Sequence, residues 1–372
     1  MRIFWLFNHP APYKVEFFNR LGLLCDLTVY FERHKEGGRN ATFYGKGVKN
    51  FHAYFGHPLI LGSINSYSRE PIKFLKKHEE YDLIVLNGWR TITERLCISY
   101  CKSHKIPYVF YINGGIIRKN ENNIKYGIKR HYIAGARFYM APDERSKEYL
   151  LHYGANPGSI ALFPYGSVAH DEILSEPYSP SGIAKIRKKV GIAEGRAFVS
   201  AGFFIERKNF EALIQAWSLM PSTDHLYLIG EGKLEKTYAR KIEQLHLENV
   251  HILPFMDHSN LFRFYRACDA FVFPSKEDIY GHVITEALSQ GLPVFSSANV
   301  NASIRLIEPG VNGGIVDFDN IEEVAMVLKR PILPETKQAC IDSARQFTFE
   351  NSAKAHEALF QKMVEALEKE KK

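Results

Sequence analysis

The chain has 372 residues, of which 45% are hydrophobic and 24% are charged, and its formal net charge is +7. This length predicts two domains, and the composition is typical of a folded globular protein, which excludes disordered and fibrous classes. No apolar run approaches the roughly 20 residues that span a bilayer, and Ile3–Phe7 at the N-terminus is too short for a signal peptide. We therefore expect a cytoplasmic protein.

The first half of the chain predicts strands that alternate with helices. The strands are unbroken apolar runs without polar alternation, which is typical of a parallel sheet that is buried on both faces. The expected strands are 2–7, 27–31, 81–86, 107–112, 137–141 and 160–163, and the expected helices include 13–24 and 93–103.

Five cysteines agree with a reducing compartment. Cys97 and Cys101 lie four residues apart on an expected helix. No His or second Cys pair lies nearby at a metal-binding spacing, so we expect ordinary packing thiols and no metal site.

Basic residues gather in the first half, where 24 Lys and Arg stand against 16 Asp and Glu in residues 1–180. The densest stretch is Arg118–Arg130, in which basic residues outnumber the single acid. It is either a solvated helix face or a surface for anionic lipid headgroups or a phosphate-bearing acceptor. No nucleic-acid recognition module is present, so nucleic acid is not an expected partner.

A linker is expected at Glu176–Gly182, which is rich in Pro, Ser and Gly. A second set of alternating elements follows it. Its expected strands are 197–201, 225–229, 250–254, 270–273 and 293–296, and its expected helices are 183–190, 210–219, 234–245, 261–268 and 282–290. Two doubly wound α/β domains that face each other across a cleft are the predicted fold. Ligands bind beyond the carboxyl ends of strands in such sheets, so functional residues are expected in the loops that follow strands.

One such loop has the sequence SKEDIYG and lies between a buried strand and a helix that starts near His282. The start of a helix offers free backbone N–H groups and a positive dipole end, which suit phosphate, and Gly281 permits close approach. Glu286 in the helix, and Glu277 and Asp278 in the loop, can accept hydrogen bonds from sugar hydroxyls. Alternatively, these acids only complement the helix dipole or stay solvated.

This segment resembles the donor-binding signature of glycosyltransferase family 4, whose members have the GT-B fold and retain the anomeric configuration. The family frame is an acid, seven residues and a Glu, set in P-S-x-x-E-x-F-G-x-x-x-x-E-A-x-x-x-G-x-P-V. The matching residues are Pro274, Ser275, Gly281, Glu286, Ala287, Gly291, Pro293 and Val294, with Tyr280 for the aromatic residue. The first acid of the frame is Asp278 in place of Glu, and Glu277 competes with it for that role.

The resemblance implies a role for each part of this segment. Glu286 would hold the ribose, and Asp278 or Glu277 would bind hydroxyls of the transferred sugar. The backbone around Tyr280, Gly281, His282 and Val283 would bind the diphosphate and the sugar.

A second match is GFFIERKN, which begins at Gly202 after a strand and precedes a helix. Lys208 occupies the place of a family lysine that contacts the donor diphosphate, where a cation neutralises the leaving group. The family often has an Arg directly after the glycine. Here Phe203 stands at that position, and Arg207 is a candidate substitute.

Two further loops of the second domain are weaker matches. LIGEG places Gly230 in a Gly-x-Gly turn after a strand, where the family lines the nucleotide. Leu253, Pro254 and Phe255 fall where the family contacts the base, and core packing explains them equally well.

The loops of the first domain resemble the family mainly in layout and are expected to face the acceptor. His9 and Tyr13 follow the first strand, Trp89 follows the strand 81–86, and Asn113 and Gly114 follow the strand 107–112. His9 either binds substrate or caps a helix, and Trp89 either stacks on a sugar or is buried. The paired Gly114 and Gly115 indicate either close approach or a tight turn.

The predicted domains are an acceptor domain over 1–175, a donor domain over 176–350 and a closing helix over 351–372 that packs back on the first domain. The resemblance implies a retaining, metal-independent glycosyltransferase that uses a UDP- or GDP-sugar as substrate, without a cofactor. The implied acceptor is a glycan or lipid-linked sugar in surface polysaccharide assembly at the inner face of the cytoplasmic membrane. The alternatives are a sugar-nucleotide 2-epimerase of the same fold and a catalytically silent sugar-nucleotide-binding partner.

Overall fold

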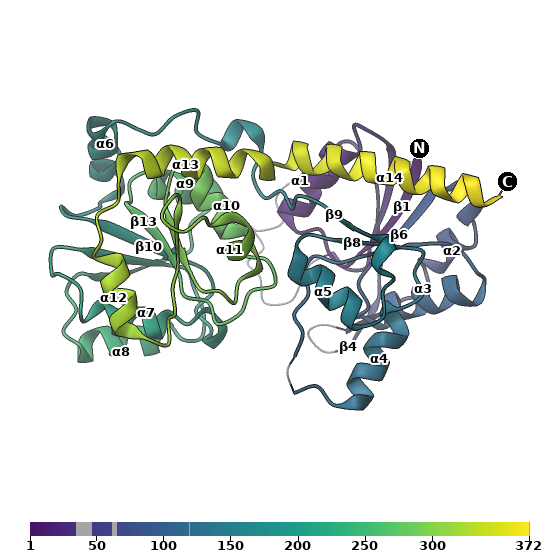
Figure 1. Ribbon diagram of the computed structural model, residues 1–372, viewed down its shortest axis with the longest axis horizontal. Coiled ribbons are helices and arrows are strands. Elements are labelled where there is room, and N and C mark those ends of the chain that lie inside the picture. Colours follow the sequence, from purple (N-terminus) through teal and green to yellow (C-terminus); the bar gives the residue numbers. More distant parts are fainter. Residues whose placement is uncertain (35–46, 62–64, 119, 372) are drawn as a thin grey trace. The chain divides into compact units, whose positions relative to one another are not determined.

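The computed structural model describes residues 1–34, 47–61, 65–118 and 120–371, and the chain forms two compact units (Figure 1). The first unit comprises residues 1–166 together with 348–372, and the second comprises 167–347. The division falls nine residues before the expected boundary at 175/176, because the chain enters the second unit before the Pro- and Ser-rich stretch.

The first unit is built on a parallel sheet of seven strands in the order β3-β2-β1-β6-β7-β8-β9. Strands on both sides of β1 pair with it, so the strand order reverses between β1 and β6. Its strands are β1 Arg2–Phe7, β2 Asp26–Phe31, β3 His52–Phe55, β6 Leu83–Asn87, β7 Val109–Tyr111, β8 Phe138–Ala141 and β9 Ile160–Leu162. A separate antiparallel pair consists of β4 Leu59–Leu61 and β5 Asn65–Tyr67.

Helices cover both faces of this sheet, because successive side chains of a strand point to opposite faces. Phe4 and Leu6 of β1 join a core with helices on one face. Trp5 packs on the other face against α1 and α14, where Phe18 and Phe360 meet its ring edge to face at 5.2 and 5.8 Å. The helices are α1 Pro12–Leu21, α2 Ile72–Leu75, α3 Ile92–Ser103, α4 Asn123–Ile133, α5 Glu144–His152 and α14 Phe349–Lys371.

The second unit repeats this plan with six parallel strands in the order β12-β11-β10-β13-β14-β15. Here the order reverses between β10 and β13. The strands are β10 Ala197–Ala201, β11 His225–Ile229, β12 Val250–Leu253, β13 Ala270–Phe273, β14 Val294–Ser296 and β15 Gly313–Ile315. The doubly wound α/β fold predicted for both domains is confirmed.

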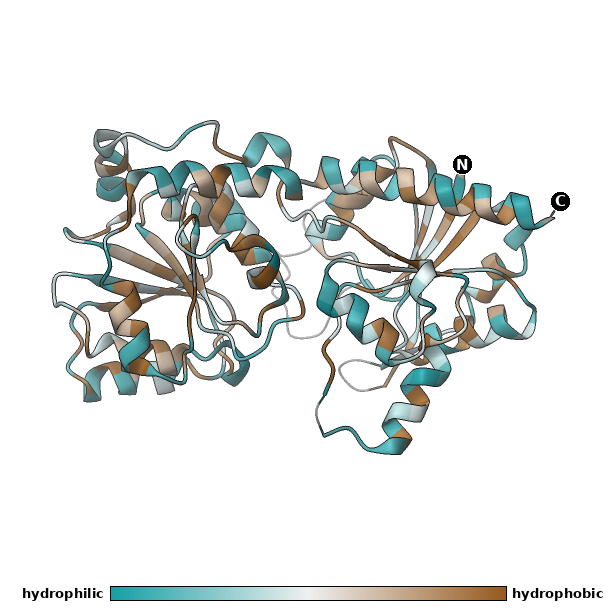
Figure 2. Cartoon of the chain, viewed as in Figure 1, coloured by the Kyte–Doolittle hydropathy of each residue, from teal (hydrophilic) through white to brown (hydrophobic). Residues whose placement is uncertain are grey.

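Helices also sandwich the second sheet. The core on one face joins β10 and β11 to α7, α8 and α12, and the strands are the more hydrophobic parts of each unit in Figure 2. The helices are α6 Pro180–Val190, α7 Phe210–Trp217, α8 Glu235–Gln244, α9 His258–Tyr265, α10 His282–Ser289, α11 Asn301–Leu306, α12 Ile321–Leu328 and α13 Pro334–Ala344.

One sequence-based expectation differs from the structure, and another agrees with it. Residues 180–182, expected in the linker, begin α6, because Ser179 caps that helix through Gly182 N and Pro180 fills its first position. The closing helix α14 belongs to the first unit, where Glu350 pairs with Arg20 of α1 at 2.9 Å. Among the described residues, no helix is both long and apolar enough to cross a membrane.

Candidate functional site

The candidate site of the second unit lies where the strand order reverses. In a doubly wound sheet the loops that follow the two strands at this point diverge and leave room for a ligand at the carboxyl edge. The loop after β10 carries Arg207 and Lys208 on a short 3₁₀ turn, and the loop after β13 carries Glu277 and Asp278. Both loops were selected from the sequence, and the fold places them side by side.

Three charged side chains of these two loops form one cluster. Lys208 Nζ lies 2.6 Å from Asp278 Oδ2, and Arg207 contacts the same oxygen at 3.0 Å. Arg207 also donates to the backbone carbonyl of Glu277 at 2.6 Å. The two candidates for the first acid therefore differ: Asp278 offers its carboxylate to the cations, whereas Glu277 offers its carbonyl.

Burial and the neighbouring charges shift the pKa values of Lys208 and Asp278. Burial lowers the pKa of Lys208, although Asp278 opposes that shift. Burial alone would raise the pKa of Asp278, but Lys208 and Arg207 outweigh it and hold the pKa below its usual value. Lys208 is only 8% exposed, and Arg207 is largely exposed. One carboxylate thus faces two cations, so these three side chains keep a net positive charge that suits an anion.

Helix α10 begins beside this cluster. Its N-cap, Gly281, has φ of 100°, and a Cβ there would lie 2.6 Å from Val300 Cγ1, so the position requires glycine. The Tyr280 ring is buried and lies 5.0 Å from the His282 ring, so it packs below the loop. His282 and Val283 are partly exposed in the first turn, where backbone N–H groups have no partner within the helix.

Glu286 lies one turn further along α10 and is partly buried. Burial, followed by the negative charge of Glu172, raises the pKa of Glu286 to about 7. Among the described residues, no hydrogen bond or ion pair reaches the Glu286 carboxylate. A partly exposed carboxylate of this kind favours a ligand that brings hydroxyl groups.

The glycines predicted to line the nucleotide also hold the loops together. Gly202, Gly230 and Gly232 each have φ of 155°. A Cβ on Gly230 would lie 2.0 Å from the Gly202 carbonyl oxygen, and one on Gly232 would lie 2.6 Å from the Phe204 carbonyl oxygen. The loops after β10 and β11 therefore touch backbone to backbone, which gives the Gly-x-Gly turn a structural reason beside any binding role.

The residues expected near the base and the donor differ in exposure. Phe255 is 44% exposed beyond the end of β12, whereas Leu253 is partly buried at the end of that strand. Phe203, where the resembled family has an Arg, is 39% exposed. Phe255 is thus more available to a base than Leu253.

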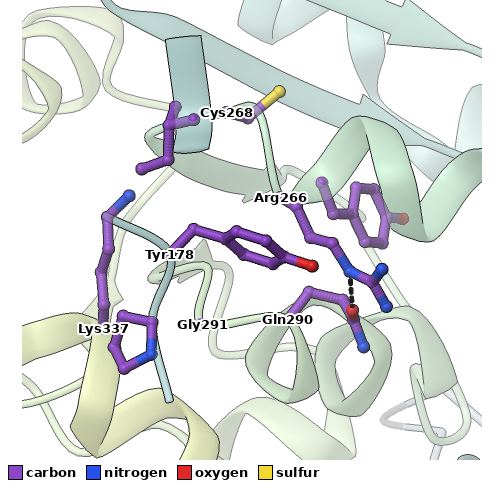
Figure 3. A pocket seen from close by; sticks show the side chains of 9 residues that line it. Tyr178, Arg266, Cys268, Gln290, Gly291 and Lys337 are labelled. Carbon is purple, nitrogen blue, oxygen red and sulfur yellow. Dashed lines mark hydrogen bonds between the residues drawn. The ribbon is translucent and has the colours of Figure 1, made fainter. Parts of the chain in front are cut away.

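A small hollow of about 10 Å³ lies at the opposite edge of the second sheet (Figure 3). It is bounded by Gln290 and Gly291 after the end of α10 and by Cys268 before β13. Tyr178 lies within it, and Arg266 donates to Gln290 at 2.7 Å (Figure 3). Because these groups precede strands or follow the C-terminal end of α10, the hollow is not part of the switch-point site.

The first unit has an equivalent edge between β1 and β6. Asn113 follows β7, where its Oδ1 accepts from Tyr165 Oη at 2.9 Å and its Nδ2 donates to Asn87 Oδ1 at 3.3 Å. His9 is buried in the loop after β1, and Tyr13 is partly exposed in the first turn of α1. The structure therefore brings the expected acceptor-side residues to the carboxyl edge of one sheet.

The structure favours packing roles for Trp89 and for the paired glycines Gly114 and Gly115. The Trp89 indole N–H donates to Tyr149 Oη at 3.2 Å, and the Arg95 guanidinium covers its ring at 5.2 Å. Gly114 has φ of 147°, and a Cβ on Gly115 would lie 2.4 Å from the Tyr149 ring. The glycine pair thus allows close approach of the backbone to Tyr149.

Lys14 was not identified from the sequence. It lies 1% exposed in the first turn of α1, where its amine donates to Tyr111 Oη at 3.2 Å and lies 4.3 Å from the Tyr165 ring centre. Burial holds the pKa of Lys14 well below its usual value. Its aromatic partners are distant in sequence, so no local pattern could reveal this site.

A buried acid at the same edge was also missed. Glu32 directly follows β2 and accepts hydrogen bonds from Ser66 and, at 3.0 Å, from Thr91. Burial raises the pKa of Glu32 to about 7, and the pKa of the buried Glu94 is raised by burial and by Glu32. The position of Glu32 just after an expected strand was a signal that could have identified it.

Comparison with known proteins finds a family match in the second unit. Residues 182–347 match the family described as "Glycosyl transferases group 1". The chain is 30% identical over 139 residues to the lipopolysaccharide core biosynthesis glycosyltransferase LpsE of Rhizobium meliloti, a match that covers 37% of this chain and 40% of LpsE. It is 24% identical over 234 residues to the lipopolysaccharide glucosyltransferase WaaG of Escherichia coli, covering 59% of this chain and 62% of WaaG. The matches thus span less than two thirds of either relative.

Solved structures resemble the whole chain. The crystal structure of Anabaena HepE in complex with UDP and glucose superposes with a TM-score of 0.66 at 18% identity and covers 99% of both chains. At this identity the likeness concerns the fold. The fold is GT-B, with two Rossmann-like α/β units, as the sequence predicted.

Proposed function

We propose that the chain is a retaining glycosyltransferase that moves a sugar from a nucleoside diphosphate sugar to a glycan or lipid-linked acceptor. The observation that carries the proposal is the cluster of Lys208, Arg207 and Asp278 at the switch point, beside the N-terminus of α10. Cations and the N-terminus of a helix both favour binding of a diphosphate, and this place supplies both.

Each part of the donor has a matching group. Lys208 and Arg207 would bind the diphosphate, and Asp278, held by both cations, would turn to hydroxyls of the sugar. Glu286, which has no donor among the described residues, would accept the ribose hydroxyls. Phe255 lies exposed where a uracil or guanine base would extend beyond β12.

The reaction would use no metal and no protein nucleophile. Lys208 and the start of α10 would stabilise the leaving diphosphate. Its oxygen would take the proton of the acceptor hydroxyl on the same face of the sugar, which retains the configuration. The one aspartate-x-aspartate sequence of the chain, Asp317–Asp319, lies away from these loops, and Asp317 accepts from Asp319 N at 3.0 Å in the turn before α12.

The acceptor proposal rests on the relatives and on the first unit. LpsE and WaaG are named for lipopolysaccharide, so we infer surface polysaccharide assembly for this chain. His9, Tyr13 and Asn113 lie at the carboxyl edge of the first sheet, where an acceptor would bind.

We further propose peripheral contact with the inner face of the cytoplasmic membrane through α4 and the residues before it. Ile124 and Ile128, one turn apart, are 75% and 42% exposed, and Lys125 and Arg130 are exposed on the same helix. Exposed apolar and cationic side chains together suit an anionic lipid surface. Lys129 does not belong to this surface, because it pairs with Glu121 at 2.5 Å. Lys119 lies outside the described residues.

Incubation with a panel of labelled UDP- and GDP-sugars tests the proposal. Donor hydrolysis, or transfer to a lipid-linked glycan acceptor, is the expected result, with the anomeric configuration read by NMR. An epimerised sugar nucleotide would instead indicate a 2-epimerase, and binding without turnover would indicate a silent binding partner. Activity that is lost with chelator and restored by Mn²⁺ would contradict the metal-independent reaction.

A further inference from the structure

The first unit contains a pocket of about 630 Å³ that the proposed transfer reaction does not use. It lies between the end of α3, the segments before β7 and β8, and the last turns of α14. Both segments precede strands, so the pocket opens at the edge of the sheet opposite the acceptor-side loops. Its volume is within the range of small-molecule sites, about 300–1,000 Å³.

The charged lining of the pocket is mainly positive. Lys102, Lys105 and Arg137 line it together with one acid, Glu370. Arg137 pairs with Glu370, but the two side chains are 39% and 52% exposed, and solvent weakens such a pair. A ligand with more negative charge than one carboxylate can therefore displace Glu370 from Arg137.

Tyr108, beside the pocket, has a buried hydroxyl without a partner among the described residues. Tyr108 is 2% exposed and lines the pocket, and among the described residues its hydroxyl makes no hydrogen bond. Burial raises the pKa of Tyr108, so the hydroxyl stays protonated and can donate. A ligand oxygen that reached this hydroxyl would supply the hydrogen bond that it lacks.

Two lysines line this pocket from constrained positions. Lys105 has φ of 55° at the position after α3 where Gly or Asn is usual, and Ile106 N closes the turn on Cys101 O at 2.9 Å. Lys102 donates to the His131 carbonyl, and burial lowers its pKa. An anion beside Lys102 would reverse that effect.

We propose that this pocket binds a phosphate-bearing ligand, with Lys102, Lys105 and Arg137 around the phosphate and the Tyr108 hydroxyl donating to it. A phosphate carries more charge and more acceptor oxygens than the Glu370 carboxylate, which suits three cations and a spare hydroxyl. The remaining lining includes Ile106, Pro107 and Leu367. This apolar surface would cover a small organic group attached to the phosphate.

Titration with inorganic phosphate, followed by calorimetry at constant ionic strength, tests the proposal. The full chain carries Lys208→Gln throughout, which removes the other expected phosphate site. We expect saturable binding that the double variant Lys105→Gln/Arg137→Gln weakens at least tenfold. The matched control is Lys76→Gln, an exposed lysine of the same unit outside the pocket, which is expected to bind as the parent does.

Tyr108→Phe separates a ligand contact from a structural role. Because its hydroxyl has no protein partner, its removal is expected to leave the melting temperature unchanged or higher, while phosphate binding weakens about threefold to tenfold. A lower melting temperature with unchanged phosphate binding would overturn the proposed contact.

Vesicles of phosphatidic acid, compared with phosphatidylcholine, identify the source of the phosphate. Binding of those vesicles that is lost in Lys105→Gln/Arg137→Gln supports a lipid headgroup, and saturable binding of free phosphate supports a soluble ligand. If the double variant binds both phosphate and vesicles as the parent does, the pocket is not a phosphate site.

Discussion

Lys208 and Asp278 lie 70 residues apart in sequence, yet Lys208 Nζ is 2.6 Å from Asp278 Oδ2. The contact joins the loops after β10 and β13 at the point where the strand order reverses. In the proposed reaction the donor diphosphate takes over the cations that Asp278 now neutralises. The same contact therefore stabilises the unliganded protein and marks the diphosphate position.

Replacement of Asp278 by Asn tests this exchange. Loss of one partner of a largely buried pair is expected to cost about 3 kcal/mol, because Lys208 and Arg207 then lack a counter-charge. UDP or GDP would restore that charge, so nucleotide is expected to raise the melting temperature more in Asp278→Asn than in the parent. Glu277→Gln is the control, since Glu277 meets Arg207 through its carbonyl. If UDP or GDP raises the melting temperature of Asp278→Asn and Glu277→Gln equally, Asp278 is not part of the diphosphate site.

Glu286 is expected to make donor binding depend on pH. Its pKa is about 7 in the unliganded protein, and ribose hydroxyls that donate to the ionised carboxylate would lower it. Binding of UDP-glucose or GDP-mannose, which lack a terminal phosphate that titrates, is thus expected to tighten about threefold to tenfold between pH 6 and 8. Calorimetry at both pH values measures this change in affinity, and Glu286→Gln is expected to remove the pH dependence of binding.

The same carboxyl has an opposite effect on folding stability. The folded protein holds the Glu286 proton more tightly than the unfolded chain, so the free energy of unfolding falls as pH rises from about 4.5 to 7. Unfolding curves for the parent and Glu286→Gln measure this contribution. A Glu286→Gln variant that keeps the full pH slopes of both binding and stability would exclude an elevated pKa at this position.

Gly230→Ala is expected to disrupt the contact between the loops after β10 and β11. The new Cβ would lie 2.0 Å from the Gly202 carbonyl oxygen, and overpacking of this kind costs about 1–3 kcal/mol beyond the strain of a positive φ. Gly310→Ala is the matched control, because Gly310 has φ of 83° with open space around it. Thermal unfolding should therefore show a larger loss for Gly230→Ala, and equal losses would mean that the loops can separate freely.

Charge reversal on α4 tests the membrane proposal. Lys125→Glu/Arg130→Glu is expected to release the protein from anionic vesicles in a flotation assay, because each cation contributes about 1 kcal/mol near such a surface. Ile124→Ser/Ile128→Ser is expected to weaken binding as well and to reduce its resistance to salt. Unchanged flotation of both variants would mean that this helix face is merely solvated.

Local patterns in the sequence predicted the sheets well and located the two loops that meet at the switch point. Buried strands such as Arg2–Phe7 and Ala270–Phe273 have the expected bounds, because unbroken apolar runs between turn signals specify them. Strand β3, His52–Phe55, was missed because it lies at the sheet edge with half its residues exposed. An edge strand has no continuous apolar run to identify it.

Contacts between distant residues could not be predicted in the same way. The sequence located Lys208 and Asp278 but did not show that they form one ion pair. Arg118–Arg130 was expected to be a basic stretch with one acid, but the sequence did not show that this acid, Glu121, pairs with Lys129. The Lys14 contact with Tyr111 spans 97 residues, so only the folded chain reveals it.

Binding of UDP and GDP to Lys208→Gln tests the donor site most directly. By calorimetry, the parent is expected to bind at least one of the two nucleotides, and Lys208→Gln is expected to bind it about tenfold to hundredfold more weakly, because a charge-assisted contact to the diphosphate is lost. Lys236→Gln, an exposed lysine of α8 in the same unit, is expected to bind as the parent does. Equal binding of UDP and GDP by the parent and by Lys208→Gln would contradict the proposed donor site.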